Sequence, residues 1–223
     1  MSLWKRFFGK KPFRRYPDSF TLSKETKLTT LCQWVHQQAT PENVVLVLCH
    51  FPATFLVNQQ AMQQTGIDYE ILADPLSETG LVNLIDQQKN GRRPLVLLSM
   101  AQMLRADKPA AGQIPIPSLK LAVIVTERYP LVACDEQLEM FMKQTGLSVS
   151  LGYLLSFDDA VLNHLLGERF VELMKQLGLG ENHLVSSVMT DRALSRHLKK
   201  ATDSIVHEQR AESAEEWIRL NLT

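Results

Sequence analysis

A chain of 223 residues is long enough for one large domain, or for one domain with a helical appendage. Apolar residues make up 45% of it and charged residues 22%, the proportions of an ordinary soluble globular protein. The 24 basic and 24 acidic residues cancel, which excludes the globally basic surface that nucleic-acid-binding proteins show.

The cysteine content and the lack of long apolar runs indicate a cytoplasmic protein. The three cysteines, Cys32, Cys49 and Cys134, are far apart and include no CxxC pair, which argues for a reducing compartment and against a disulfide framework or a structural zinc site. No apolar run approaches the ~18–20 residues that span a bilayer. The basic N-terminus lacks the apolar stretch of a signal peptide. We expect a cytoplasmic location, free or peripheral to the inner membrane, and no metal or other cofactor.

Residues 1–19 are predicted to form a basic, aromatic arm. Residues 1–16 hold six basic residues and no acid, which leaves 18 basic against 24 acidic residues in the rest of the chain. Such an arm suits an anionic bilayer or an acidic protein partner, and single-stranded nucleic acid uses the same residue types. Docking of the arm on the protein's own sheet also stays open, whereas nucleic acid is disfavoured by the acidic body. The candidate contact residues are Trp4, Lys5, Arg6, Phe7, Phe8, Lys10 and Lys11.

Residues 1–16 contain no acid to pair with their basic residues. We therefore expect residues 2–16 to be dispensable for folding and to give a salt-sensitive attraction to anionic surfaces.

After the arm, apolar runs alternate with helical patterns. Helical spacing places Leu28, Leu31, Trp34 and Val35 on one face of a helix. The run after it, NVVLVLCHF, is typical of a strand that is buried on both faces. The predicted helices cover residues 24–38, 53–66, 77–91 and about 135–144, and the predicted strands 43–51, 67–74, 94–99, 119–127 and 147–156. The alternation predicts a doubly wound, mainly parallel α/β domain over residues 20–156.

From residue 157 the pattern changes to helical periodicity, with Leu194, Leu198, Ala201 and Ile205 forming one apolar stripe. The sequence therefore predicts a helical extension over residues 157–223, and residues 147–156 are expected to be the last strand.

Three local patterns invite a catalytic interpretation, and each has a structural alternative. Asp158 and Asp159 follow Ser156, where carboxylates cap a first helical turn, and capping is favoured over proton transfer or metal binding. Cys49 and His50 are adjacent on a strand and point to opposite faces, so they cannot form a nucleophile–base pair with each other. Glu127 could polarise a water molecule, but a structural role is favoured.

The segments VTERYPLVACDEQL and YLLSFDDAVLNHLLGERFVELMKQLGL resemble the second nucleotide-binding domain of the SecA family, the motor ATPases of bacterial preprotein translocation. The resemblance is specific at residues 119–177 and covers roughly residues 20–205 by pattern. It implies a fold of the P-loop NTPase type, specifically that of a helicase C-terminal domain. The matching signature residues are Thr126, Glu127, Arg128, Asp135, Gln137, Leu138, Ser156, Asp159 and Arg169, with Leu155 and Asp158 also in register.

The departures from the family pattern concern its chemistry. The family has glycines in the loop after the third strand, where this chain has Gln102 and Leu104. It also has three arginines after the Gln-Leu pair, where this chain has Glu139, Phe141 and Gln144. Side chains in the loop keep the backbone away from phosphate, and an arginine finger is typically worth ~10³–10⁵ in rate.

A first motor domain with a GxxxxGK[ST] loop is absent from the sequence as well. The sequence thus predicts a pseudoenzyme, with no catalytic and no cofactor-binding residues, that acts by binding a protein partner near the membrane or the export machinery. We expect it neither to hydrolyse nor to bind ATP tightly. The alternative is half of a split ATPase that completes a nucleotide site with a first motor domain on another chain.

Overall fold

The computed structural model describes residues 13–88, 95–105, 120–176, 184–186, 188–203 and 205–222. These residues form a sheet with the strand order β4-β5-β3-β6-β7-β2-β8, and β1 also pairs with β7. All pairings are parallel except that of β2 with β8. The strands are β1 (Phe13–Arg15), β2 (Ser19–Thr21), β3 (Asn43–Cys49), β4 (Glu70–Ile71), β5 (Val96–Met100), β6 (Lys120–Val125), β7 (Ser148–Ser156) and β8 (Val185–Ser186).

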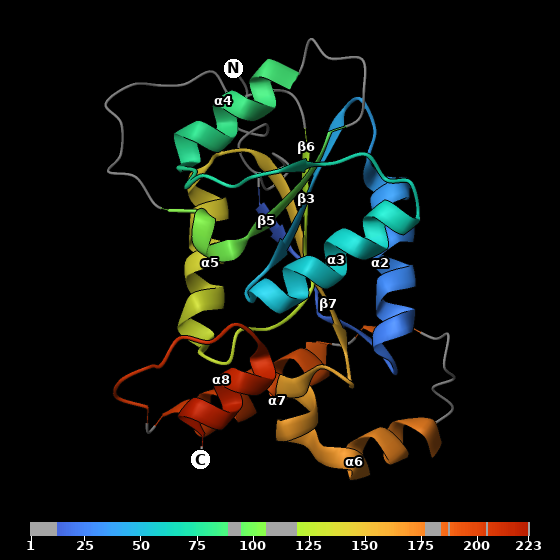
Figure 1. Cartoon of the computed structure of the whole chain (residues 1–223), viewed down its shortest axis with the longest axis vertical. Helices are drawn as coiled ribbons and strands as arrows, with labels where there is room; N and C mark the ends of the chain where they lie inside the picture. Colours follow the sequence, from blue (N-terminus) through green and yellow to red (C-terminus); the bar gives the residue numbers. More distant parts are fainter. Residues whose placement is uncertain are drawn as a thin grey trace, which may run out of the picture.

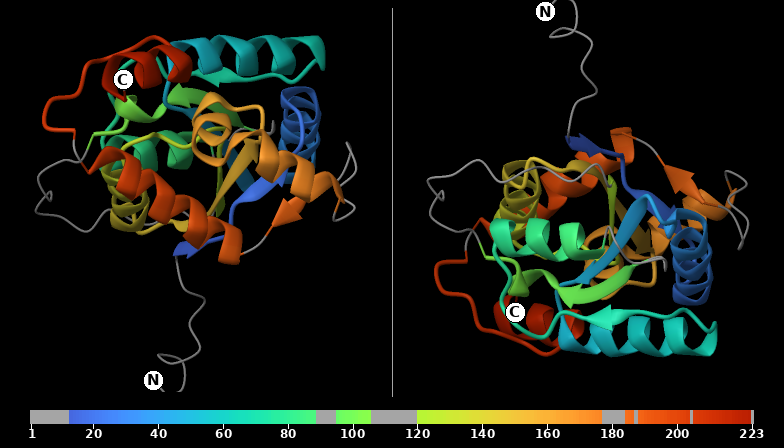
Figure 2. Two further views of the ribbon diagram at one scale, coloured as in Figure 1. Left: turned by 90° about the horizontal axis from the view of Figure 1, so that it is seen from below. Right: turned by 90° about the horizontal axis from the view of Figure 1, so that it is seen from above.

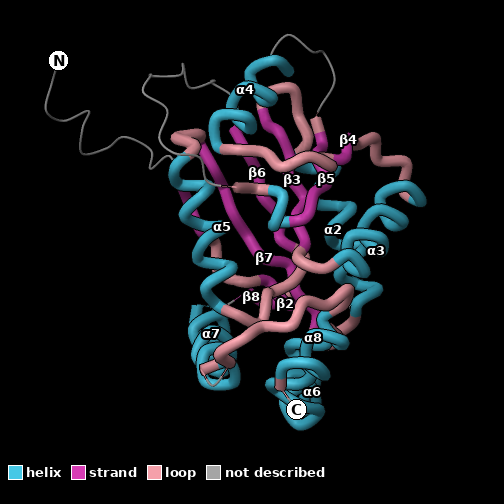
Figure 3. Tube along the Cα trace, turned by 60° about the vertical axis from the view of Figure 1, so that its left-hand side comes forward, coloured by secondary structure: helices cyan, strands magenta, loops and turns pink. Residues whose placement is uncertain are grey.

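Helices cover both faces of the sheet, as Figure 3 shows with α5 on one side and α2 and α3 on the other. The predicted doubly wound, mainly parallel α/β fold is confirmed. The helices are α2 (Lys24–Gln38), α3 (Pro52–Gln64), α4 (Glu78–Gln88), α5 (Val132–Gln144), α6 (Ala160–Gln176), α7 (Val188–Thr202) and α8 (Ala214–Asn221), with a short 3₁₀ turn at Ala101–Met103. None of these described helices is long and apolar enough to cross a membrane.

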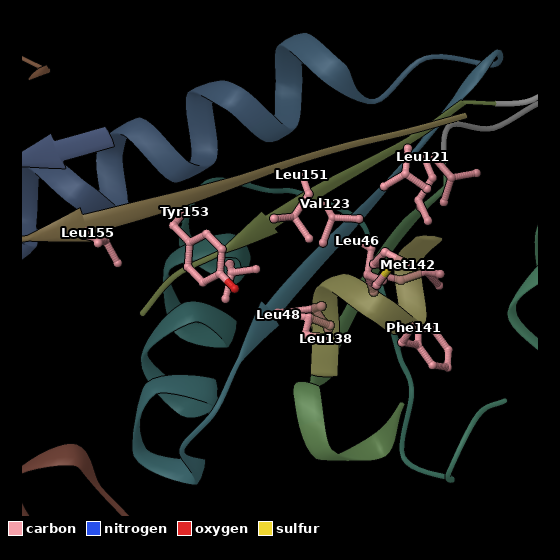
Figure 4. Close-up of a cluster of buried hydrophobic side chains, with 14 of the residues drawn as sticks. Leu46, Leu48, Leu121, Val123, Leu138, Phe141, Met142, Leu151, Tyr153 and Leu155 are labelled. Atoms are coloured by element: carbon pink, nitrogen blue, oxygen red, sulfur yellow. The ribbon is translucent and has the colours of Figure 1, made fainter. Parts of the chain in front are cut away.

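Two apolar cores result from the two-residue period of the strands. In β3, Leu46 and Leu48 face the core under α4, α5 and the C-terminal helices, whereas Val45 and Val47 face the core under α2 and α3. Figure 4 shows the first of these cores, in which the strand side chains pack against Leu138, Phe141 and Met142 of α5. Continuous apolar runs are therefore needed in the central strands, because both of their faces are buried.

The helices α6, α7 and α8 gather beyond the carboxyl ends of the strands, at the lower end of Figure 1. α6 is interrupted at Gly167, whose φ of 67° and ψ of 171° are not helical. Seen along the sheet in Figure 2, α8 lies beside the start of α3. The predicted helical extension thus covers one edge of the sheet.

One expectation from the sequence is wrong. β7 is not the last strand, because β8 pairs antiparallel with β2. No local pattern marks β8, which has only two residues. The described end of the predicted arm lies in the sheet, because β1 pairs with β7, and this agrees with the docking on the sheet that the sequence left open. The domain boundaries themselves stay a prediction.

Candidate functional site

The ends of three strands meet at the carboxyl edge of the sheet, where open α/β sheets bind their ligands. His50 follows β3, residues Thr126, Glu127 and Arg128 follow β6, and Ser156 ends β7. Because β3, β6 and β7 are neighbours in the sheet, these polar residues lie next to one another. The edge therefore holds both the signature residues and the candidate site.

Arg128 is the centre of a buried ion-pair network. Its Nε and Nη2 donate to Asp18 at 2.9 and 2.7 Å, and its Nη1 donates to Asp135 at 3.0 Å. Nη2 also donates to Asp191 at 2.6 Å, and the guanidinium carbon lies 4.1 Å from the ring centre of Tyr153. The Arg128 side chain is only 5% exposed. Its charge is neutralised inside the protein and is not available to a ligand.

The two acids that share Arg128 have pKa values shifted in opposite directions. Burial raises the pKa of Asp18, and the charge of Arg128 does not offset this effect. Burial also acts to raise the pKa of Asp135, but the hydrogen bond and charge of His50, together with Arg128, outweigh it and lower the pKa. The difference follows from His50, whose Nε2 lies 3.0 Å from Asp135 Oδ1, and from Asp191, whose like charge lies near Asp18.

Glu127 binds the N-terminus of α3 from inside the protein. Its Oε1 accepts the backbone N–H groups of His50 at 2.6 Å and Phe51 at 2.9 Å, and its Oε2 accepts the hydroxyl of Thr54 at 2.7 Å. Burial raises the pKa of this carboxyl, and these hydrogen bonds act against that rise. A strand–loop–helix start of this kind is a typical anion site, since its N–H groups and the helix dipole favour negative charge. Here the anion is the protein's own side chain.

A second buried network, made of one ion pair and its hydrogen-bonding neighbours, joins the strand ends to α2 and α3. Lys27 Nζ donates to Asp159 Oδ1 at 2.5 Å and to the carbonyl of Thr126 at 3.1 Å. Asp159 Oδ2 accepts the N–H of Ser156 at 2.8 Å, and Asn58 Nδ2 donates to Thr126 Oγ1 at 2.8 Å. These contacts fasten four elements together, which is a structural role.

A C-terminal strap, defined as residues 205–213, crosses the carboxyl edge before α8. The carboxylate of Glu208 accepts hydrogen bonds from the hydroxyl of Tyr129 and, at 2.6 Å, from Nε1 of Trp217. Trp217 is fully buried and meets the Tyr129 ring edge-on, with 6.1 Å between the ring centres. Burial, reinforced by Glu208, raises the pKa of Tyr129. The strap and α8 are thus anchored to the end of β6.

The strap forms one wall of an open cleft of about 760 Å³ at this edge. The carbonyl of Glu212 accepts the N–H of Ala53 at 3.0 Å, which ties the strap to α3 as well. Aromatic rings of Phe51, Tyr129 and Phe141 contribute to the lining. The charged lining residues are Arg105, Arg210, Glu208 and Glu212. The cleft combines apolar and polar groups, with basic and acidic residues in equal number.

The residues that replace the family's glycines and two of its arginines lie in this cleft: Gln102, Leu104, Phe141 and Gln144. Glu139 has a different role, because its Oε1 accepts the Nε of Arg15 at 3.1 Å. Arg15 also donates to Asp18 at 2.6 Å. Arg15 is therefore paired with two acids that lie outside residues 1–16.

The structure brings together most of the signature residues. Arg128 and Asp135 bind each other, and Glu127 caps the neighbouring helix as described above. Leu138 is buried in the core, and Gln137 lies exposed on the cleft lining. The side chain of Arg169 and all seven candidate contact residues of the arm lie outside the described residues. Their roles stay predictions.

The acids after Ser156 and the cysteine–histidine pair have structural partners. Asp158 accepts the N–H of Lys24 at 3.2 Å at the start of α2, which extends its expected capping role to another helix. Cys49 Sγ donates to the Ser99 carbonyl at 3.7 Å, away from His50. Burial raises the pKa of Cys49 and also that of Cys134, the latter to about 11. Among the described residues no group of His, Cys, Asp and Glu could hold a metal ion.

The sequence interpretation missed Asp18, Lys27, Glu208 and Trp217. Only Lys27 had a readable signal, because it lies four residues before Leu31 and so falls on the apolar stripe of its helix. A lysine on a buried stripe needs an acidic partner. The other three are joined to the site by contacts between distant parts of the chain, and no local pattern marks them.

Comparison with known proteins gives no family. No protein-family model matches the chain, and no curated protein matches it. Among solved structures it is similar to the C-terminal part of the Fun30 ATPase domain, with 16% identity and a TM-score of 0.36. The match covers 80% of this chain and 56% of the Fun30 chain, so this chain spans little more than half the length of the Fun30 chain. A similarity at this level assigns no family.

Proposed function

We propose that this chain is a non-catalytic α/β module of the helicase C-terminal type that acts by binding a protein partner. The observation that carries the proposal is that Gln102, Leu104, Phe141 and Gln144 line the cleft, where the resembled motors have glycines and arginines. The Glu127 carboxylate also fills the start of α3, with Oε1 2.6 and 2.9 Å from two backbone nitrogens. A phosphate at this place would have to displace a buried carboxylate and would meet its negative charge. A module with this arrangement is poorly suited to binding a nucleotide by its phosphates.

The charges around the cleft support the same proposal. Phosphoryl transfer needs several cations around the phosphates, because negative charge is spread over the transferred group. Arg128 and Lys27 are both paired with buried acids, and Arg15 is paired with Asp18 and Glu139. The cleft lining offers two arginines and two glutamates, so it has no excess of positive charge for a triphosphate.

The partner in this proposal belongs to the protein-export machinery at the membrane surface. Its support is the similarity of the TERYPLVACDEQL and LLSFDDAVLNHLL motifs to those of an export motor. The residues of these motifs that fall at the carboxyl edge are used here for internal ion pairs and caps. A chain that keeps the shape of such a domain without its chemistry retains surfaces that other proteins can bind.

The open cleft of about 760 Å³ favours one second candidate, half of a split ATPase. In that candidate a first motor domain on another chain would supply the P-loop and would close on this edge. The side chains of Gln102, Leu104, Phe141 and Gln144 in the cleft oppose it, because they provide neither a close approach of backbone to phosphate nor a cation.

The test uses Glu127 as the variable. Thermal unfolding of the wild-type chain, Glu127→Gln and Glu127→Ala is measured with increasing Mg-ATP or inorganic phosphate. The amide of Glu127→Gln can accept the same N–H groups and donate to Thr54, so this variant serves as the folded control. We expect no ligand-dependent rise in the melting temperature for wild type or Glu127→Gln, and a phosphate-dependent rise for Glu127→Ala, whose α3 N-terminus is empty. A saturable stabilisation of wild type by Mg-ATP would overturn the proposal.

A further inference from the structure

One side of the molecule carries two neighbouring helical segments that lack acidic residues, lysine and arginine, and whose one histidine is His36. Residues 28–38 of α2 and Pro52–Gln64 of α3 together contain no aspartate, glutamate, lysine or arginine. At the 22% charged residues of the whole chain, a stretch of this length would hold about five. The absence cannot be explained by burial, because only the inner sides of these helices face the sheet.

The outer sides of these helices are rich in glutamine and carry exposed apolar groups. Leu56 is 56% exposed and Val57 is 45% exposed, both on α3. The seven glutamines of the two segments are Gln33, Gln37, Gln38, Gln59, Gln60, Gln63 and Gln64, all exposed except the half-buried Gln59. Figure 3 shows α2 and α3 beside each other on one face of the sheet. The two helices contact each other, and the groove between their N-terminal ends, outside the uncharged segments, holds the exposed pair Lys24–Glu215. The two uncharged segments thus form one continuous surface, called here the glutamine face.

We propose that the glutamine face is an interface between two copies of this chain. Depletion of charge with retention of apolar groups is the composition of an interface core rather than of ordinary surface. Two-fold association brings each surface against itself, so any charge on it risks meeting a like charge. A face without charges avoids this cost.

The glutamine side chains also make the glutamine face complementary to a second copy of itself. Each amide has two donor hydrogens and an acceptor oxygen, so two glutamines can hydrogen-bond each other reciprocally. A surface of carboxylates or ammonium groups cannot pair with itself in this way. The chemistry of the glutamine face therefore fits a second copy of itself better than an acidic or basic partner.

The size of the face sets the expected strength. α2 and α3 have 15 and 13 residues, which makes each about 20 Å long. With helix diameters of about 10 Å, the two cover a projected area of roughly 400 Å² on each copy, or about 800 Å² in total, which is below the ~1,000 Å² of a stable specific interface. We expect a weak dimer in exchange with monomer, with a dissociation constant in the micromolar range. The inference is independent of the proposed function, because it uses neither the cleft nor Glu127.

The experiment measures the molar mass of the full chain by sedimentation equilibrium over a wide concentration range. Leu56→Glu places two like charges on the face and is expected to weaken the dimer by at least about tenfold. Met140→Glu is the matched control, because Met140 is 57% exposed but lies on α5, on the other side of the sheet. Gln60→Glu is a second, nearly isosteric variant in case Leu56→Glu disturbs α3.

The outcomes separate clearly. Dimerisation of wild type and Met140→Glu, with loss in Leu56→Glu and Gln60→Glu at unchanged circular dichroism, supports the proposal. A wild-type chain that stays monomeric up to millimolar concentration overturns it. A dimer that is insensitive to both substitutions on α3, or that Met140→Glu weakens equally, also overturns it, because the interface then lies elsewhere.

Discussion

Replacing Arg128 with methionine removes the cation that binds three acids from three segments of the chain, and leaves Arg15 beside Asp18 and Asp191. In the folded protein Arg128 donates to Asp18, Asp135 and Asp191 at distances of 2.6 to 3.0 Å. Asp18 is fully buried, so it loses its principal partner without gaining access to water. Breaking a buried ion pair in this way costs about 3–5 kcal/mol. That is a large part of the ~5–15 kcal/mol by which domains are stable.

The pH dependence of this loss can be stated with its sign. Burial already raises the pKa of Asp18 in the wild-type protein, and loss of Arg128 removes the main group that lowers it. An acid whose pKa is raised in the folded state opposes folding while it is ionised, and this cost vanishes as pH falls below the folded-state pKa. The destabilisation by Arg128→Met should therefore be largest near pH 8 and should shrink toward pH 5.

Urea unfolding at the two pH values, followed by circular dichroism, measures the effect. Arg128→Lys keeps the charge but cannot reach all three acids from one nitrogen, so we expect an intermediate loss. Adding Asp18→Asn to Arg128→Met should restore part of the stability, because the double variant no longer buries that charge. A loss below about 1 kcal/mol, or a loss that is the same at both pH values, would show that the network does not have the energetic role assigned to it.

Three further outcomes can be measured by thermal or urea unfolding. Gly167→Ala should destabilise more than Gly66→Ala, because Gly167 combines φ 67° with ψ 171°, a region open almost only to glycine. A left-handed φ of 69°, as at Gly66, costs other residues roughly 1–2 kcal/mol. Equal losses of stability in the two variants would contradict this. Trp217→Ala should cost about 3–5 kcal/mol and loosen the strap, seen as faster proteolysis within it, and unchanged stability would count against the anchoring contacts. Deletion of residues 2–12 should leave the melting temperature within a few degrees and abolish any salt-sensitive flotation with anionic liposomes. Deletion of residues 2–16 also removes β1 and Arg15 and should lower the melting temperature clearly. A larger loss from the shorter deletion would refute the structural role of β1 and Arg15.

The central part of the fold could be predicted from the sequence because each helix and each buried strand has its own pattern of apolar residues. α2 begins and ends at the predicted residues 24 and 38. The apolar runs at β3, β5 and β6 predicted strands that are buried on both faces. The predicted strand 67–74 is reduced to Glu70–Ile71, because it lies at the edge of the sheet and both residues are exposed. Edge position is a tertiary property that a local pattern does not carry.

The candidate site was less predictable because its groups come together only in the folded chain. Asp18 and Arg128 are 110 residues apart. Asp18 also follows a basic stretch, and the sequence interpretation considered the charge of that stretch rather than Asp18. The residues that depart from the resembled motif, such as Gln102 and Phe141, could be picked out directly from the sequence. The identity of the group that fills the α3 N-terminus could not, because Glu127 reaches it across 76 residues.

The most direct measurement of the central claim is a calorimetric titration of Mg-ATP into the purified wild-type chain. The account holds that the carboxylate of Glu127 takes the place of a phosphate and that the nearby cations are neutralised inside the protein. It therefore predicts no saturable heat of binding at protein concentrations in the tens of micromolar. One-to-one binding with a dissociation constant in the low micromolar range would contradict it.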